Sequence, residues 1–193
     1  QPASDVTNQI AALQAAVAQL NRSARAFIVE SGKGVLTIVE TGGNSVVASV
    51  PVGLNPIEVA VNAAGTRGFV TNNNSNTVSV VDLASATVTA TIAVGSRPWG
   101  IALNPAGTRA FVANRSGNSV SVIDTLNSAV TATIPVGNGP IGMAVNPAGT
   151  RVYVSNSTPS DSVSVIDSAT NTVISTIPVG TNPTGVVFNP SGT

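Results

Sequence analysis

Short runs in which apolar and polar residues alternate recur along most of the chain, and turn-forming residues separate them. In one representative stretch these runs cover residues 109–113, 120–123, 129–134 and 142–145. Alternation with a period of two is typical of a β-strand that has one face in a core. Between the runs lie Gly-Asn-Gly-Pro at 137–140 and Asn-Pro-Ala-Gly at 146–149, which supply the proline and glycine that tight turns favour. The pattern therefore predicts four antiparallel strands in this stretch.

The stretch repeats along the chain with a period of about 42 residues. Arg25, Arg67, Arg109 and Arg151 are each 42 residues apart, and the segments at 51–53, 93–95, 135–137 and 178–180 follow the same period to within one residue. Four-stranded repeats of this length are typical of β-propeller blades, which cover their apolar faces with neighbouring blades. We therefore predict an all-β fold, a β-propeller of four four-stranded blades, over units 25–66, 67–108, 109–150 and 151–193. A solenoid is the alternative.

One tetrapeptide marks the repeat. It reads Tyr-Val-Ser-Asn at 153–156, Phe-Val-Thr-Asn at 69–72 and Phe-Val-Ala-Asn at 111–114, whereas the first unit has Glu30 in place of the asparagine. With its flanking turns the unit resembles the YVTN-type β-propeller repeat, and the resemblance extends over residues 25–193. It implies a protein that is secreted or displayed on the surface of a bacterium or archaeon, with the periplasm as another location.

The first 24 residues follow a different pattern. Their apolar residues are spaced four and three apart, which places them on one stripe of a helix. These residues are Val6, Ile10, Leu13, Val17 and Leu20. We predict an amphipathic helix over about residues 5–22 that serves docking or oligomerisation. Packing on its own propeller and a short coiled coil with another copy are equally compatible with the stripe.

The phase of the repeat predicts how the two ends of the repeat region relate. The first unit begins with the run at 25–29 and lacks the strand that should precede it, while residues 185–188 repeat such a strand at the other end. An unpaired edge strand accepts another strand, so we expect residues 185–188 to complete the first blade. The side chains expected at this junction are Phe27, Val29, Val186 and Phe188.

Four arrangements satisfy that expectation. Pairing within one chain gives a four-bladed ring, and mutual exchange between two chains gives a closed ring of eight blades. Exchange without closure gives a head-to-tail polymer, and the fourth arrangement is a piece of a longer propeller. Because propellers of the resembled family have more than four blades, exchange between chains or a longer propeller is favoured over a lone four-bladed ring. Self-association, or binding to other surface proteins, is the expected partnership.

Composition narrows the chemistry. The 193 residues include eight basic and eight acidic residues, so the formal net charge is zero, and there is no cysteine or histidine. Without a basic stripe we expect no nucleic-acid binding. No apolar run reaches the 18 or more residues of a membrane-spanning helix, and the usual nitrogen and sulfur metal ligands are missing. We therefore expect no transmembrane segment, no metal and no cofactor.

Some charged residues recur in every repeat, and this favours a structural role. Asp82, Asp124 and Asp167 share one repeat position, and we expect each to fix a turn while each repeated arginine braces a blade. A ring of charges around a pore is the alternative. Binding sites are usually built from residues that break a repeat, and here Glu58, Arg97 and Trp99 do so. We predict that these three hold a polar ligand. The alternative is that Trp99 fills a gap between blades while the two charges are solvated.

No catalytic constellation is evident, so we predict no catalytic residue. The sequence is best interpreted as a non-enzymatic extracellular structural or interaction protein that uses a propeller for assembly or partner binding. A lactonase- or hydrolase-like propeller enzyme and a module that captures a carbohydrate or a peptide are the alternatives. The native mass, turnover on lactone and ester panels, and ligand binding after Trp99→Ala distinguish the three.

Overall fold

The computed structural model describes residues 24–189, and the helix predicted over residues 5–22, with its stripe of apolar residues, lies outside that range. Within it the regular elements are all strands. They are β1 Arg25–Glu30, β2 Val35–Glu40, β3 Ser45–Pro51, β4 Pro56–Val61, β5 Arg67–Asn72, β6 Thr77–Asp82, β7 Thr87–Ala93, β8 Pro98–Leu103, β9 Arg109–Asn114, β10 Ser119–Asp124, β11 Ala129–Pro135, β12 Pro140–Val145, β13 Arg151–Asn156, β14 Ser162–Asp167 and β15 Thr172–Pro178. The strands predicted over 109–145 are confirmed, each lengthened by no more than two residues at either end.

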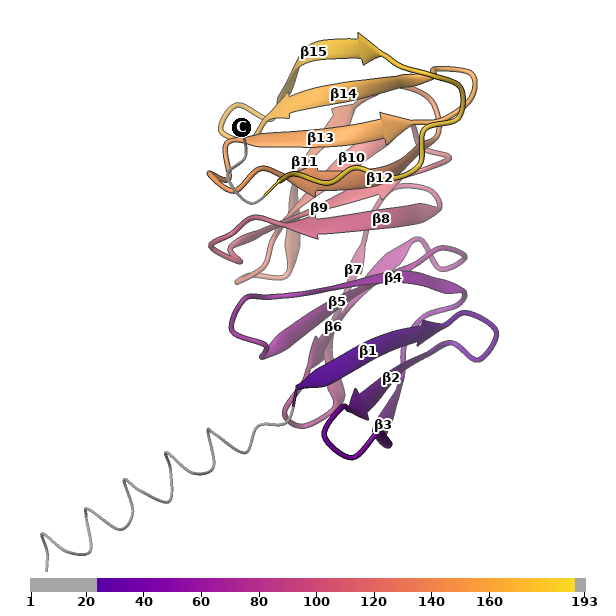
Figure 1. The fold of residues 1–193 in the computed structure, drawn as a ribbon, viewed down its shortest axis with the longest axis vertical. Helices are drawn as coiled ribbons and strands as arrows, with labels where there is room; N and C mark the ends of the chain where they lie inside the picture. Colours follow the sequence, from indigo (N-terminus) through magenta and orange to yellow (C-terminus); the bar gives the residue numbers. More distant parts are fainter. Residues whose placement is uncertain (1–23, 190–193) are drawn as a thin grey trace, which may run out of the picture.

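The strands form four antiparallel sheets, which we number in chain order (Figure 1). Sheet 1 has the order β1-β2-β3, sheet 2 the order β4-β5-β6-β7, sheet 3 the order β8-β9-β10-β11 and sheet 4 the order β12-β13-β14-β15. The sheets do not coincide with the arginine-led units, because the fourth strand of each unit pairs with the first strand of the next. Each of sheets 2 to 4 therefore begins before its arginine.

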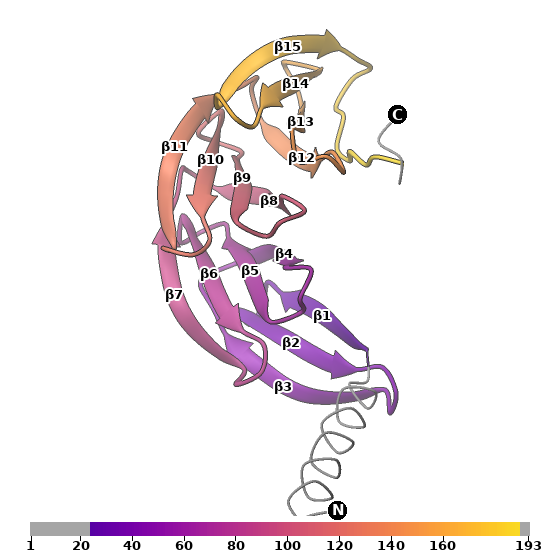
Figure 2. The ribbon, with the colours of Figure 1, turned by 90° about the vertical axis from the view of Figure 1, so that its left-hand side faces the viewer.

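The sheets follow one another in an open arc (Figure 2). The first strands, β1, β4, β8 and β12, lie on the inner side of the arc and contact one another in sequence, and β3, β7, β11 and β15 lie on the outer side. All-β sheets in this arrangement are those of a β-propeller-like repeat fold. The arc leaves sheets 1 and 4 at opposite ends (Figures 1 and 2).

Apolar side chains fill each space between neighbouring sheets. Three buried clusters separate sheets 1 and 2, sheets 2 and 3, and sheets 3 and 4. Phe69 and Phe111 are the largest fully buried side chains, and each comes from the second strand of its sheet. Burial of such aromatic side chains provides much of the free energy of folding. Each sheet therefore depends on its neighbours for its core, as expected of a repeat protein.

Two expectations about sheet 1 need correction. It has three strands rather than four, and residues 181–189 form no strand. Completion of the first blade by residues 185–188 of the same chain is therefore wrong, as is the four-bladed ring it would close. The physical reason is the open arc, which holds the two segments at opposite ends of the molecule. Pairing between chains stays a prediction.

Candidate functional site

The free edge of β1 is the first region that departs from the repeat. The equivalent strands β5, β9 and β13 each lie between two strands of their sheet, whereas among the described strands β1 pairs with β2 alone. Ile28 is 43% exposed, whereas the equivalent Val70 and Val112 are fully buried. Phe27 and Val29 are half-buried beside it. This strand presents a row of unpaired backbone groups, which is a template for another strand.

Residues 182–188 occupy the place of an inner strand beside sheet 4. The Asn182 N–H donates to Asp161 Oδ1 at 2.8 Å, just as the Arg97 N–H donates to Asn76 Oδ1 at 2.8 Å before β8. Ser155 Oγ donates to the Thr184 carbonyl at 2.9 Å, matching the 2.7 Å bond from Thr71 Oγ1 to the Trp99 carbonyl. The segment is thus seated like β8 and β12, but no described strand pairs with it.

Side chains at the end of this segment are only partly covered. The ring of Phe188 packs edge-on against Tyr153 with centroids 5.0 Å apart. Val186 is half-buried, and Val187 is 89% exposed. The four side chains predicted for strand closure or exchange are therefore split between the two ends of the arc, and the structure of one chain does not bring them together.

The repeated arginines brace neighbouring sheets, and the last of them differs. Arg25 donates to the Leu83 carbonyl of sheet 2 at 2.9 Å, Arg67 to the Thr125 carbonyl of sheet 3 at 2.6 Å, and Arg109 to the Ser168 carbonyl of sheet 4. Each of these carbonyls belongs to the residue directly after a repeated aspartate. Arg151 belongs to the last sheet that the structure describes, and it pairs with Asp167 of its own sheet at 2.6 Å.

The repeated aspartates organise turns. The repeated aspartates, Asp82, Asp124 and Asp167, each accept two backbone N–H groups. The donors are the residues two and three positions further along the chain. These hydrogen bonds, with those from neighbouring side chains, hold the pKa of each carboxyl below its ordinary value, and Arg151 adds to the effect at Asp167. These contacts are structural: each aspartate holds its turn, and Asp167 also pairs with Arg151.

Glu58 stands where the other inner strands have glycine. Gly100 and Gly142 are pressed against the next inner strand, and a Cβ at Gly100 would lie 2.1 Å from the Ile141 carbonyl oxygen. Glu58 is instead paired with Thr71, so the irregularity in β4 precedes it. Although the residue is exposed, its Oε2 accepts the Ile101 N–H at 3.1 Å. Partial desolvation raises the pKa of Glu58, while the Ile101 hydrogen bond acts in the opposite direction.

Arg97 and Trp99 lie together at the start of β8, and the structure adds a residue that sequence reasoning missed. The guanidinium of Arg115, which follows β9, stacks over the Trp99 ring at 4.7 Å from its centroid. The signal was present in the sequence, because the repeat has Asn73 and Ser157 where Arg115 stands. Glu58 binds the backbone of β8 at Ile101, and among the described residues no hydrogen bond or ion pair joins its side chain to that of Arg97 or Trp99.

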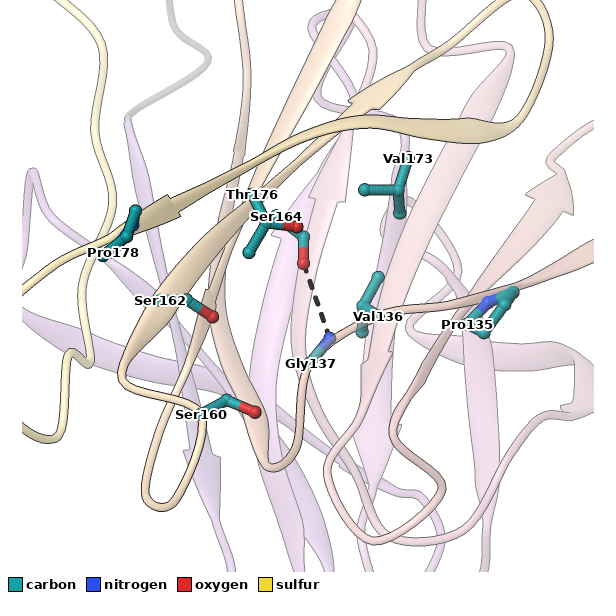
Figure 3. A pocket seen from close by; sticks show the side chains of 9 residues that line it. All are labelled: Pro135, Val136, Gly137, Ser160, Ser162, Ser164, Val173, Thr176 and Pro178. Carbon is teal, nitrogen blue, oxygen red and sulfur yellow. Dashed lines mark hydrogen bonds between the residues drawn. The ribbon is translucent and has the colours of Figure 1, made fainter.

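A separate pocket of about 470 Å³ lies between sheets 3 and 4 (Figure 3). Its walls come from the end of β11 with the following turn and from β14 and β15, and the Gly137 N–H donates to Ser164 Oγ at 3.5 Å. The lining contains no ionisable side chain. It is lined by Pro135, Val136, Gly137, Ser160, Ser162, Ser164, Val173, Thr176 and Pro178. Three serines and a threonine suit weak contacts with a neutral polar molecule rather than a reaction.

Residues 24–189 contain neither a cluster of metal-binding side chains nor a helix that could cross a membrane. No three carboxylate-bearing residues gather there closely enough to hold a metal ion. No helix in that range is long and apolar enough to cross a membrane.

Comparison with known proteins identifies the fold. No protein-family model matches the chain, and no curated protein matches it either. Among solved structures it is similar to the hydrazine synthase of Kuenenia stuttgartiensis, with 30% identity and a TM-score of 0.83 over 87% of this chain and 50% of that one. It is also similar to a functionally unknown protein from Desulfotomaculum acetoxidans, with 19% identity and a TM-score of 0.68 over 89% of this chain and 60% of that one.

The chain thus spans half to three fifths of the solved chains it resembles. The two similarities cover 87% and 89% of this chain, and together they support a β-propeller-like repeat fold.

Proposed function

We propose that the protein is a non-enzymatic scaffold whose copies assemble by strand pairing, with residues 183–188 of one copy completing sheet 1 of another. The observation that carries the proposal is the pair of complementary edges. The edge of β1 lacks the inner strand that sheets 2 to 4 possess, and residues 183–188 are seated as such a strand without a partner. Mutual exchange between two copies gives a closed ring of eight sheets.

The repeat fixes the expected register. In sheet 4, Met143 lies opposite Val154 and Ala144 opposite Tyr153. The same offsets place Val186 of one copy opposite Ile28 of the other, and Val187 opposite Phe27. This pairing would cover Ile28, Phe27 and Val29, and it would satisfy the unpaired backbone groups of β1.

A second feature of the same junction supports the proposal. Residue Thr41 stands at the repeat position of Leu83 and Thr125, whose carbonyls receive the braces from Arg25 and Arg67. In the closed pair, Arg151 of one copy would reach the Thr41 carbonyl of the other. It would then give up its contact with Asp167 and instead reach the neighbouring sheet, as Arg25, Arg67 and Arg109 do.

Two further attributes belong to this proposal. The repeat motif supports membership of the YVTN-type propellers, and that membership implies a secreted or cell-surface location. A rigid ring with short, protected edges suits an extracellular scaffold, because closure removes the exposed edges that promote aggregation.

Cysteine cross-linking tests the pairing, since the chain has no native cysteine. We expect Ile28→Cys/Val186→Cys to form a disulfide between copies under mild oxidation, giving a product of twice the chain mass on a non-reducing gel. The matched control, Ile28→Cys/Val187→Cys, moves one thiol to the opposite face of the strand and should not cross-link efficiently. Sedimentation velocity of the unmodified chain should give twice the monomer mass.

The outcomes are distinct. A monomer at tens of micromolar with no cross-link in either variant would overturn the proposal. A ladder of larger products would support the strand pairing but overturn the closed pair. Cross-linking of both variants to the same extent would mean that the register is wrong.

A further inference from the structure

Three departures from the repeat gather at one end of sheet 3. At the position of Arg97 the other repeats have Asn55, Gly139 and Asn182. At the position of Trp99 they have isoleucine or threonine, and at that of Arg115 they have asparagine or serine. The packing common to all repeats does not require residues that occur in only one of them. Their clustering therefore indicates a binding site.

Backbone pairing holds the two arginines side by side. Arg97 immediately precedes β8 and Arg115 immediately follows β9, and the Arg115 N–H donates to the Arg97 carbonyl at 3.0 Å. Trp99 supports the pair, because the Arg115 guanidinium stacks on its ring. Stacking orients the guanidinium while its N–H edge stays available to a ligand.

The backbone at Arg97 is strained for an arginine. Its φ is +52°, in the left-handed region, where the other repeats have asparagine or glycine. Those residues adopt this conformation readily, whereas a long side chain does not. The turn therefore does not explain the arginine, which points to a role for its side chain.

The charges of both arginines are uncompensated within the described part of the chain. The repeated arginines donate to backbone carbonyls or to Asp167, and Lys33 pairs with Glu30 at 2.6 Å. The Arg97 and Arg115 side chains are exposed and make no ion pair. Two arginines whose backbones are hydrogen-bonded to each other and whose charges have no counter-ion among the described residues offer the guanidinium groups that bind a carboxylate.

A polar cavity of about 320 Å³ adjoins Arg97. It is lined by Asn73, Asn74, Asn76, Ser96 and Arg97, with no apolar side chain among them. Two of its amides are held in place, because Asn73 Nδ2 donates to the Pro98 carbonyl at 3.1 Å and Asn76 Oδ1 accepts the Arg97 N–H at 2.8 Å. Fixed amides beside a hydroxyl are suited to a ligand rich in hydroxyl groups.

We propose that this end of sheet 3 binds an acidic saccharide. A sugar carboxylate would bind the Arg97 and Arg115 guanidiniums, and the ring hydroxyls would bond to the amide of Asn76, which its bond from the Arg97 N–H holds in place, and to that of Asn74. Trp99 acts by holding Arg115. An acidic peptide is less suited, because only polar side chains line the adjoining cavity. The site lies where the turn between β5 and β6 of sheet 2 meets the start of β8 in sheet 3. It uses no residue of β1 and does not depend on assembly.

Calorimetric titration with a short oligogalacturonate tests this site, with the fully methyl-esterified oligomer as the neutral comparison. We expect binding of the acid form that weakens as NaCl is raised, and no measurable binding of the ester. Variants that install residues from other repeats should preserve the fold, so we expect Arg97→Asn and Arg115→Ser each to weaken binding at least about tenfold. Trp99→Ile should weaken it less.

Lys33→Gln is the matched control, because it also removes one positive charge, from an exposed side chain in sheet 1. Its affinity should equal that of the unmodified chain. Equal weakening by Lys33→Gln, binding of the ester as strongly as the acid, or tighter binding of a glutamate oligomer than of the uronate would each overturn the proposal. Sedimentation of the same variants separates this test from that of assembly, since the arginine variants should keep the native mass.

Discussion

Strands β1 and β9 occupy the same position in their repeats, yet they differ in burial. Phe111 and Val112 of β9 are fully buried, whereas Phe27 is half-buried and Ile28 is 43% exposed in β1. The side chains are alike in size and polarity, so their own chemistry does not explain the difference. What differs is that β9 has β8 beside it and a sheet on either side, while within residues 24–189 no inner strand lies beside β1 and no sheet precedes it.

The comparison shows that the burial of a side chain in this fold depends on the strand and the sheets that lie next to it. A repeat contributes one apolar face to the sheet before it and one to the sheet after it, so a sheet at the end of an array keeps one face uncovered. The exposed Ile28 is the face that a preceding sheet would cover. Any partner that supplies that sheet would give β1 the environment of β9.

Truncating Phe111 of β9 and Phe27 of β1 should give the largest difference between the two equivalent strands. We expect Phe111→Ala to lower the free energy of unfolding by about 3–5 kcal/mol, because it leaves a cavity between sheets 3 and 4. Phe27→Ala should cost clearly less in dilute solution, because part of that ring already contacts water. Denaturant melts monitored by circular dichroism measure both.

Protein concentration sharpens this prediction. If copies pair through β1, the cost of Phe27→Ala should rise towards that of Phe111→Ala once the protein is concentrated enough to assemble. Equal costs at the lowest concentration would contradict our account of why β1 and β9 differ.

A pair of glycines offers the next largest contrast. A Cβ at Gly142 would lie 2.0 Å from the Thr184 carbonyl oxygen, whereas a Cβ at Gly185 would meet nothing within 4 Å. We expect Gly142→Ala to destabilise the fold by about 1–3 kcal/mol, since backbone must shift to admit the methyl group. Gly185→Ala should leave the thermal midpoint of dilute protein unchanged.

In the proposed pair, Gly185 would press against the Ile57 carbonyl of the second copy, as Gly142 presses against Thr184. Gly185→Ala should therefore reduce the native mass without affecting the folded monomer. A full-mass assembly of this variant would count against the strand exchange, and a lowered midpoint in dilute solution would mean that the glycine serves the monomer.

Much of the sheet structure was predictable because its signals are local. Alternation and turn residues located the strands, and the spacing of Arg67, Arg109 and Arg151 gave the period. The sequence also indicated that sheet 1 lacks a strand. The open arc was not predictable, because curvature depends on the small rotation between successive sheets, which no residue pattern encodes.

The candidate site was predictable only in part. Arg97 and Trp99 broke the repeat visibly, but Arg115 was missed because it directly follows the repeated tetrapeptide that ends at Asn114, and only the pairing of β8 with β9 brings it to Trp99. Glu58 broke the repeat as well, yet its hydrogen bond with Ile101 joins strands β4 and β8 and therefore serves packing. A departure from the repeat therefore marks a residue of interest without saying whether ligand or packing explains it.

Glu58 provides the smallest expected effect. Its raised pKa means that the folded protein binds the proton more tightly than the unfolded chain does. The protonated side chain therefore favours folding below the ordinary pKa of 4.5, and this contribution is lost as the pH rises through the raised value. Glu58→Gln stays neutral at every pH and can still accept the Ile101 N–H.

We expect the thermal midpoints of Glu58→Gln and the unmodified chain to agree near pH 4 and to separate by pH 8, with the variant more stable by no more than about 2 °C, because solvent screens much of the effect at this exposed side chain. Taking the difference between the two proteins removes the opposite contribution of Asp82, Asp124 and Asp167, whose lowered pKa values make their stabilisation disappear only as the medium becomes more acidic. A variant that is less stable at pH 8 would show that the ionised carboxylate, through its bond to Ile101, holds β4 and β8 together more than desolvation opposes it. Glu58 would then resemble the repeated arginines, as a brace between sheets that happens to be built from a different residue.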